Sequence, residues 1–142
     1  DILSGGLRGA LNLAASGQLS VADAAETTSA ALVQFKLKGK DAGHVADLLA
    51  AGAGKAMGSV GDMGQALKQS GVVASQFGVS IEETVGTLAA FASTGMIGAE
   101  AGTGFKSMLL ALAKPSREAQ RAMDELGISA YDAEGQFVGI TN

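Results

Sequence analysis

The sequence predicts an all-α fold: a bundle or zigzag of about six to seven short helices, followed by a small C-terminal β-hairpin. Three observations support this prediction. Apolar residues recur at helical spacing, Ser and Asp residues stand where helices would begin, and Gly or the single Pro interrupts the pattern at intervals of roughly 15 to 20 residues. We therefore expect a helical segment over residues 1–127, with residues 128–142 forming the hairpin or the start of a following segment.

Two helices are predicted before residue 40. The apolar face of the first is expected to consist of Leu3, Leu7, Leu11 and Ala14. Gly17 would end this helix. The second would begin at a capping box from Ser20 to Asp23, because the serine hydroxyl can accept a hydrogen bond from the third helical N–H. Gly39 would end it, after three lysines that suit the negative pole of a helix.

The middle of the chain is rich in glycine, which weakens isolated helices by about 1 kcal/mol per residue relative to Ala. Asp41 is expected to open a helix. Its apolar stripe would consist of Val45, Leu48, Leu49 and Gly52. A second possible cap, Ser59 to Asp62, precedes a helix predicted over residues 62–76, and Gly71 predicts a bend in its middle.

The clearest helix start is Ser80, followed by two acidic residues that suit the positive pole of a helix. The buried face of this helix would consist of Ile81, Val85, Leu88 and Ala92, with Phe91 beside it. Gly95 would end it. A further helix is predicted over residues 99–113, where Phe105, Met108, Leu109 and Leu112 share one stripe.

The last helix is predicted to carry Pro115 in its first turn, where a proline is tolerated. Its inward residues would be Ala119, Met123 and Leu126. Gly127 would form a left-handed C-cap. Residues 130–138 then change to an alternating pattern around Gly135, which predicts strand, tight turn and strand.

The two capped halves that start at Ser20 and Ser80 are alike at an offset of 60 residues. The matched pairs are Val21 with Ile81, Asp23 with Glu83, Thr27 with Thr87, and Leu49 with Leu109. In a chain so rich in alanine this is a weak repeat, so a structural duplication and a chance likeness both stay open.

Composition excludes several classes of protein. There are no cysteines, so disulfides and thiolate metal sites are ruled out. The net charge is −4 and the longest basic cluster is Lys36, Lys38 and Lys40, so specific nucleic-acid binding is not expected. The longest uncharged stretch, residues 84–99, is too short to cross a bilayer. Because 21 glycines and 4% aromatic residues make a core of small side chains, we expect stabilising partners.

No cluster of side chains predicts chemistry. His44 and Asp47 are three residues apart, but nothing supplies further metal ligands, so a structural histidine is the better interpretation. Glu82 and Glu83 are adjacent, and adjacent helical residues point about 100° apart, so these carboxylates would not converge on one substrate atom. We predict no catalytic residue, no cofactor and no metal, and hence a protein that is not an enzyme.

Two glycine patterns have ordinary explanations. Residues 51–58 resemble a phosphate loop only faintly, because the Gly-Lys-Ser/Thr ending is missing and no strand precedes them. G-x-x-x-G spacings join Gly54 to Gly58 and Gly98 to Gly102. In a membrane such spacings favour helix pairing, whereas here close-packed turns and helix crossings are the simpler interpretation.

The order of the motifs resembles the core of phage tail tape measure proteins. The matching segments are 19–23 (LSVAD), 45–50 (VADLLA), 59–62 (SVGD), 78–85 (GVSIEETV), 88–91 (LAAF), 95–98 (GMIG), 101–105 (AGTGF), 109–113 (LLALA), 115–116 (PS), 126–128 (LGI) and 132–135 (DAEG). The resemblance covers roughly residues 10–140. Gly104 and Phe105 depart from the family pattern, where other small or aliphatic residues are expected, and the family core usually extends further toward the N-terminus.

The resemblance implies a structural component of a phage or prophage tail. Such proteins set tail length during assembly and take part in genome delivery, so the implied location is the tail lumen of the virion, with the host cytoplasm during assembly. The implied partners are other copies of the chain, tail tube or tail-tip proteins and tail assembly chaperones, with possible host membrane contact. The alternative is a membrane-active helical module that enters the host envelope during DNA ejection. Because Gly and Pro interrupt the helices, we expect a folded docking or plug module and not one rod.

Overall fold

A computed structural model describes residues 2–55 and 58–138, with the side chains described from residue 5 onward. Over these ranges the chain is helical, with short connections between the helices. In chain order the elements are α1 (Ile2–Gly17), α2 (Val21–Gln34), the 3-10 turn η1 (Gly39–Asp41), α3 (Ala42–Gly54), α4 (Val60–Gln76), α5 (Ile81–Ser93), α6 (Gly98–Ala113) and α7 (Arg117–Leu126).

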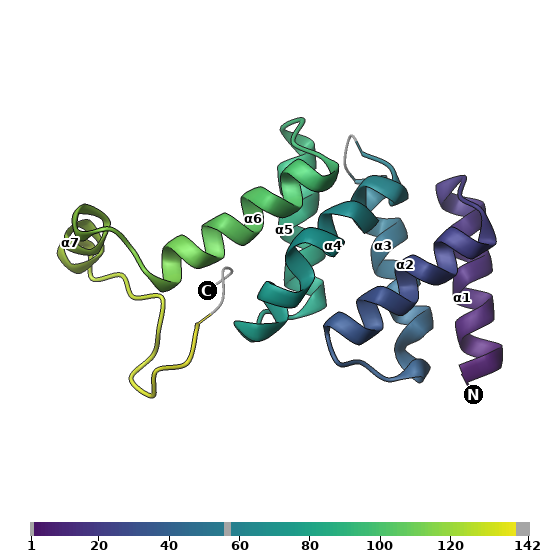
Figure 1. The fold of residues 1–142 in the computed structure, drawn as a ribbon, viewed down its shortest axis with the longest axis horizontal. Coiled ribbons are helices and arrows are strands. Elements are labelled where there is room, and N and C mark those ends of the chain that lie inside the picture. Colours follow the sequence, from purple (N-terminus) through teal and green to yellow (C-terminus); the bar gives the residue numbers. More distant parts are fainter. Residues whose placement is uncertain (1, 56–57, 139–142) are drawn as a thin grey trace.

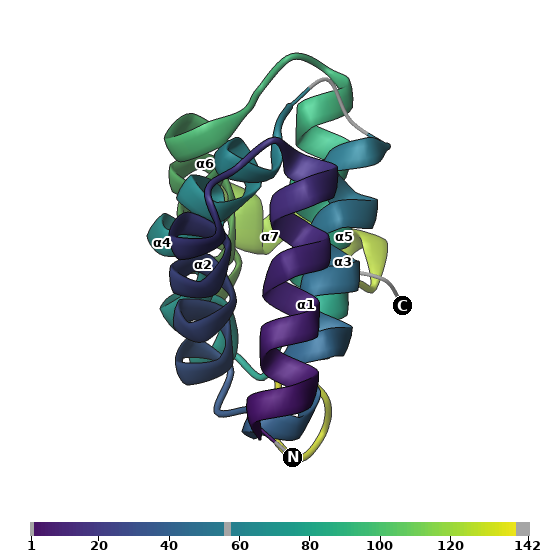
Figure 2. The ribbon, with the colours of Figure 1, turned by 90° about the vertical axis from the view of Figure 1, so that its right-hand side faces the viewer.

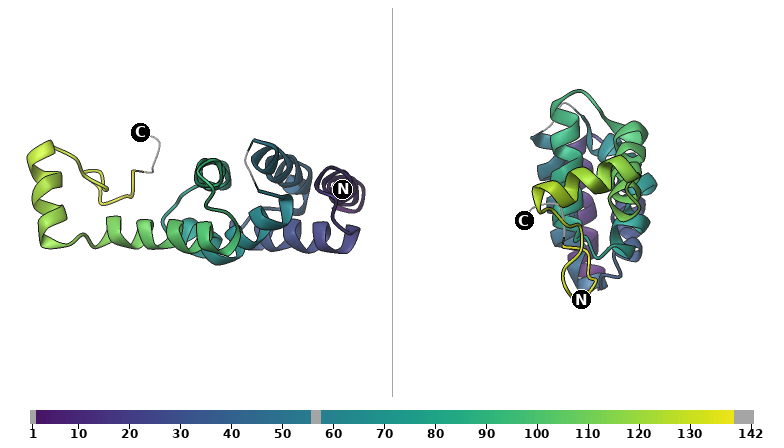
Figure 3. Two further views of the ribbon diagram at one scale, coloured as in Figure 1. Left: turned by 90° about the horizontal axis from the view of Figure 1, so that it is seen from above. Right: turned by 90° about the vertical axis from the view of Figure 1, so that its left-hand side faces the viewer.

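The first six helices form two layers (Figures 1 and 3). Helices α1, α3 and α5 lie side by side in one layer, and α2, α4 and α6 lie side by side in the other. The chain alternates between the layers, so that α1–α2, α3–α4 and α5–α6 are three helix pairs stacked along the long axis. Such stacking is the architecture of helical repeat proteins, in which each pair mainly contacts its neighbours.

The repeat that the structure shows has a different period from the one weighed in the sequence. The second helices of the three pairs have their N-caps at Ser20, Ser59 and Ile97, which lie 39 and 38 residues apart. Ser80, in contrast, caps α5, the first helix of the third pair. Ser20 and Ser80 therefore occupy different layers, and the offset of 60 residues does not relate equivalent positions.

Side-chain caps begin the helices where the sequence predicted them. The hydroxyl oxygens of Ser20, Ser59 and Ser80 each accept from the backbone N–H three residues on, at 3.1 Å in all three cases. These three predicted helix starts are confirmed. The expected position of the proline is wrong, because Ser116 caps α7 and Pro115 precedes that cap.

Helix ends share one left-handed motif. A residue with positive φ follows α1, α2, α4, α5 and α7, and the next residue is apolar and donates its N–H to a carbonyl five residues back. Glycine supplies this conformation at Gly78, Gly95 and Gly127, but Gln18 and Lys36 adopt it with φ values of 52° and 54°. The predicted cap at Gly127 is confirmed, whereas α2 ends at Gln34, before the expected break at Gly39.

The core joins all six stacked helices through small contact surfaces. Its largest fully buried side chains are Phe105, Leu13, Leu49, Leu88 and Leu109. Glycines allow the closest helix crossings. A Cβ atom added at Gly102 of α6 would collide with the backbone carbonyl of Ala66 in α4, and one at Gly9 of α1 would lie 3.2 Å from the carbonyl oxygen of Ala42.

Two predictions about helix faces and bends are wrong. Leu7 and Leu11 of α1 are 58% and 46% exposed, because the helix turns its small-residue side, with Gly9, toward α3. Ala14 of the predicted stripe is buried, and the Leu3 side chain lies outside the described part. The expected interruption at Gly71 is also absent, since α4 continues through this residue and packs it against Gln34 and Phe35 of α2.

The predicted β-hairpin is wrong. In the described residues 128–138, a turn is closed by a single antiparallel bridge between Tyr131 and Phe137, and no strand forms. Residues 139–142 of the predicted hairpin lie outside the described residues. The Phe137 ring instead packs against Phe77 with the ring centres 5.5 Å apart, which returns the chain to the helical body.

Helix α7 also differs from expectation. Ala119 and Leu126 are exposed and Met123 is only half-buried, so the predicted inward face is wrong and the helix has no buried residue. It lies beyond the free end of α6, away from the stacked pairs (Figures 1 and 3).

Candidate functional site

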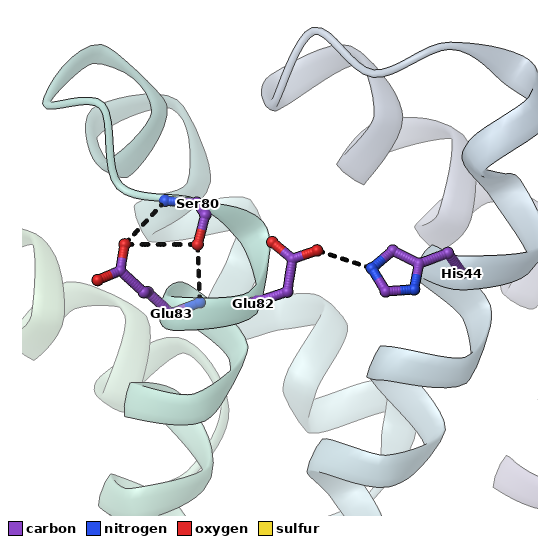
Figure 4. Close-up of polar contacts among 4 residues, drawn as sticks. All are labelled: His44, Ser80, Glu82 and Glu83. Carbon is purple, nitrogen blue, oxygen red and sulfur yellow. Dashed lines mark hydrogen bonds and ion pairs between the residues drawn. The ribbon is translucent and has the colours of Figure 1, made fainter. Parts of the chain in front are cut away.

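The polar side chains with the most contacts lie where α3 faces the start of α5 (Figure 4). His44 of α3 and Glu82 of α5 form a hydrogen bond, with Nε2 and Oε1 2.7 Å apart. Both side chains are more than half exposed. The described contact of His44 thus joins two neighbouring helix pairs, whereas the sequence had drawn attention to Asp47 on the same helix.

The two adjacent carboxylates of α5 point in different directions. Glu83 turns back to the start of its own helix, where its Oε2 accepts from the Ser80 N–H at 3.2 Å and its N–H donates to Ser80 Oγ at 3.1 Å. Glu82 points across to His44. The prediction that these carboxylates would not converge on one atom is confirmed, and the pair caps a helix and bridges two helices.

Hydrogen bonds shift the pKa values of two of these helix-start carboxyl groups. The hydrogen bond from His44 lowers the pKa of Glu82 below its usual value, and the backbone N–H of Glu82 adds to this effect. Backbone and hydroxyl hydrogen bonds from Ser59 lower the pKa of Asp62 at the start of α4. Both groups are largely exposed, so these shifts describe helix capping and a surface contact, and do not indicate a group tuned for proton transfer.

Buried hydroxyl groups bond within their own helices. Thr28, Ser70 and Thr84 are at most 4% exposed, and each donates to the carbonyl four residues before it at 2.8 to 2.9 Å. Their hydrogen-bonding needs are met by backbone of the same helix. They therefore stabilise the core and do not line a polar site.

The glycine patterns have structural positions. Residues 51–54 of the glycine-rich run form the last turn of α3, and residues 56 and 57 lie outside the described part. Gly98 and Gly102 both belong to α6, and Gly102 makes the close crossing with α4. Gly54 and Gly58 do not share a helix. One of the two spacings thus marks a helix crossing, as the simpler interpretation held.

Within residues 2–55 and 58–138, no three His, Asp or Glu side chains gather closely enough to hold a metal ion. In the same ranges, no helix combines the length and the apolar character that crossing a bilayer requires.

The sequence analysis missed the surfaces at the two ends of the stack. Four exposed apolar residues lie on the first helix pair: Leu7, Leu11, Val21 and Val33. Three more lie at the opposite end: Leu110, Leu126 and Ile128. A stacked repeat leaves such faces on its terminal pairs, because they have a neighbour on one side only. The signal available in the sequence was the clean division of residues 117–126 into a charged and an apolar side.

Comparisons with known proteins agree on one family. All 142 residues match the family model described as phage-related minor tail protein. Over 130 residues the chain is 38% identical to a tape measure protein of Pneumococcus phage Dp-1, covering 92% of this chain and 11% of that protein. Over 125 residues it is 30% identical to a probable tape measure protein of Escherichia phage P2, covering 88% of this chain and 15% of that protein. The chain thus spans less than a sixth of either relative. No solved structure matches it.

Proposed function

The chain belongs to the phage-related minor tail protein family, and on that premise we propose that it is a folded structural segment of a tape measure protein. Such a protein sets tail length during assembly and takes part in genome delivery. The observation that carries the proposal is the match over all 142 residues, together with the two relatives that bear the tape measure name. These matches confirm the resemblance carried by the ordered motifs.

The architecture supports a folded module within a longer ruler. As one straight helix, 142 residues would extend about 210 Å at 1.5 Å per residue. The chain instead returns on itself between α1 and α6, so its helices lie side by side in two layers (Figure 2). In this form the segment contributes far less length than a rod of the same number of residues. We therefore place the length-measuring rod elsewhere in the full protein and assign docking to this segment.

Partners and location follow from the family. The chain is a virion-associated tail protein, and we propose that it contacts tail tube or tail-tip proteins, with tail assembly chaperones binding it in the host cytoplasm before it enters the tail lumen. The exposed apolar residues at both ends of the stack supply surfaces for such contacts. The described polar groups support a structural role and not an enzymatic one, because they cap helices or bridge them.

The proposal is tested in the phage that encodes the chain. Mass spectrometry of purified virions should detect peptides from residues 1–142. A phage whose tape measure gene lacks residues 1–127 should then be examined by electron microscopy. We expect few complete tails, and those that form should not be shortened by the roughly 190 Å that a helical rod of this size would contribute. Tails shortened by that amount, or virions without these peptides, would contradict the proposal.

A further inference from the structure

Helix α7 presents an apolar face that the body of the protein leaves uncovered. At 100° per residue, Ala119, Ala122, Met123 and Leu126 fall within a sector of about 100°, and the charged residues and Gln120 occupy the rest of the helix. Leu126 is 72% exposed, and Ile128, just after the helix, is 54% exposed. An amphipathic helix of this kind normally buries its apolar side, so the uncovered face indicates a missing partner.

The opposite end of the molecule carries an apolar groove. It lies between α1 and α2, on the end of the stack that faces the viewer in Figure 2, and its volume is about 230 Å³. Apolar and small residues line it, among them Leu7, Ala10, Val21, Ala25, Leu32 and Gly39. Leu7 and Val21 are 58% and 44% exposed. Small residues at the floor and large ones at the rim suit a helix that inserts apolar side chains.

We propose that α7 of one copy of the chain docks its apolar face into the α1–α2 groove of a second copy. The two surfaces lie at opposite ends of the stack (Figure 1), so α7 does not reach the groove of its own molecule. The lengths agree, because α7 with 10 residues extends about 15 Å and α2 with 14 residues extends about 21 Å. The contact is heterologous, since two different surfaces meet.

Charge gives the docked helix a direction. Lys38 and Lys40 are exposed and flank Gly39 at one end of the groove. The last turn of α7 carries Asp124 and Glu125, and the negative pole of the helix dipole lies at the same end. Placing this last turn beside the two lysines joins opposite charges around the apolar contact. The docked α7 then runs in the same direction as α2, whose C-terminal end approaches these lysines.

The same charges favour a protein partner over a lipid surface. Helices that lie on membranes are rich in Lys and Arg on their polar face. On α7, Arg117 and Arg121 are outnumbered by Glu118, Asp124 and Glu125. The polar face is therefore weakly acidic and suits the lysines beside the groove better than anionic headgroups.

Because the natural chain has no cysteine, single thiols can map the contact. Leu7→Cys and Met123→Cys variants, one of them carrying a mass tag, are mixed under a mild oxidant and resolved by non-reducing electrophoresis. We expect the mixed disulfide to exceed both homodimers beyond the proportions of random collision. Val72→Cys, an exposed position in the middle of the stack, is the matched control and should give only random products with either variant. Random proportions in the Leu7–Met123 mixture would overturn the proposal.

A second experiment measures affinity by sedimentation equilibrium. Leu126→Asp should lower the self-association constant at least about tenfold, as expected for an apolar anchor at the centre of an interface. Val72→Asp, which introduces the same charge at a 50% exposed position on α4, should leave the constant unchanged. Circular dichroism of both variants checks that the fold is kept. Equal constants for the two variants, or association of the natural chain with phosphatidylglycerol vesicles in place of self-association, would refute the docked α7. The inference does not depend on the proposed function, so either can fail alone.

Discussion

The closest helix crossing in the protein gives its sharpest stability prediction. Replacing Gly102 of α6 by Ala removes a helix-weakening glycine, which by itself favours the helix by about 1 kcal/mol. The new Cβ, however, would collide with the Ala66 carbonyl oxygen and lie 2.9 Å from the Ala66 carbonyl carbon and 2.8 Å from Gln69 Cβ. Backbone cannot move aside as a flexible side chain can, and overpacking typically costs about 1 to 3 kcal/mol. We expect a net loss of about 1 to 2 kcal/mol in the free energy of unfolding.

Gly86→Ala is the matched control, because Gly86 lies in the middle of α5 and a Cβ there meets no atom within 4 Å. This variant should gain up to about 1 kcal/mol. Urea unfolding followed by circular dichroism at 222 nm should therefore separate the two variants by about 2 to 3 kcal/mol, or roughly 10 °C in Tm. Gly102→Ala as stable as Gly86→Ala would show that α4 and α6 do not cross as closely as described.

Three further predictions concern a helix end, a helix start and the core. Lys36→Gly should raise stability by about 0.5 to 1 kcal/mol in urea unfolding, since Lys36 has a φ of 54° that glycine adopts more readily; an unchanged midpoint would contradict this. Asp62→Ala should cost about 1 kcal/mol at pH 7 through loss of its capping box. Because the folded pKa of Asp62 lies below its ordinary value of 3.8, this stabilisation is present above about pH 4 and is lost as the pH falls through the folded pKa; a difference from the natural chain that persists undiminished at pH 2 would refute the role of the ionised carboxylate. Phe105→Ala should cost about 3 to 5 kcal/mol, because Phe105 is fully buried; a loss below about 1 kcal/mol by thermal unfolding would place this ring outside the core.

Helix starts were predictable because their cause is local. A Ser followed three residues later by an acidic side chain completes its hydrogen bonds within one helical turn, whatever the rest of the chain does. Ser20, Ser59 and Ser80 therefore cap helices as predicted. The left-handed end at Gly127 is local for the same reason.

Helix faces were harder to predict because packing decided them. The leucines of α1 suggested a buried stripe, but the side with Gly9 allows a backbone approach to α3 that a leucine side would prevent. Helix propensity likewise suggested a bend at Gly71, whereas contact with α2 keeps α4 continuous. In both cases a glycine serves a helix crossing, which single-sequence periodicity does not reveal.

The C-terminal region and the polar contact failed for lack of long-range information. Alternation over residues 130–138 favoured two strands, but a lone hairpin is marginal in water, and Phe137 gains more by packing on Phe77. The partner of His44 lies 38 residues away on another helix pair, which spacing within one helix does not indicate. The absence of convergence between Glu82 and Glu83 was predictable, because helix geometry alone separates neighbouring side chains.

The central claim is that this segment of the tail protein is a folded stack of helix pairs and not a length of rod. Small-angle X-ray scattering of the chain at low concentration measures this directly. A folded chain of this size should give a radius of gyration of roughly 15 to 20 Å. A value near 60 Å, as expected for one helix about 210 Å long, would contradict the stack and with it the docking role.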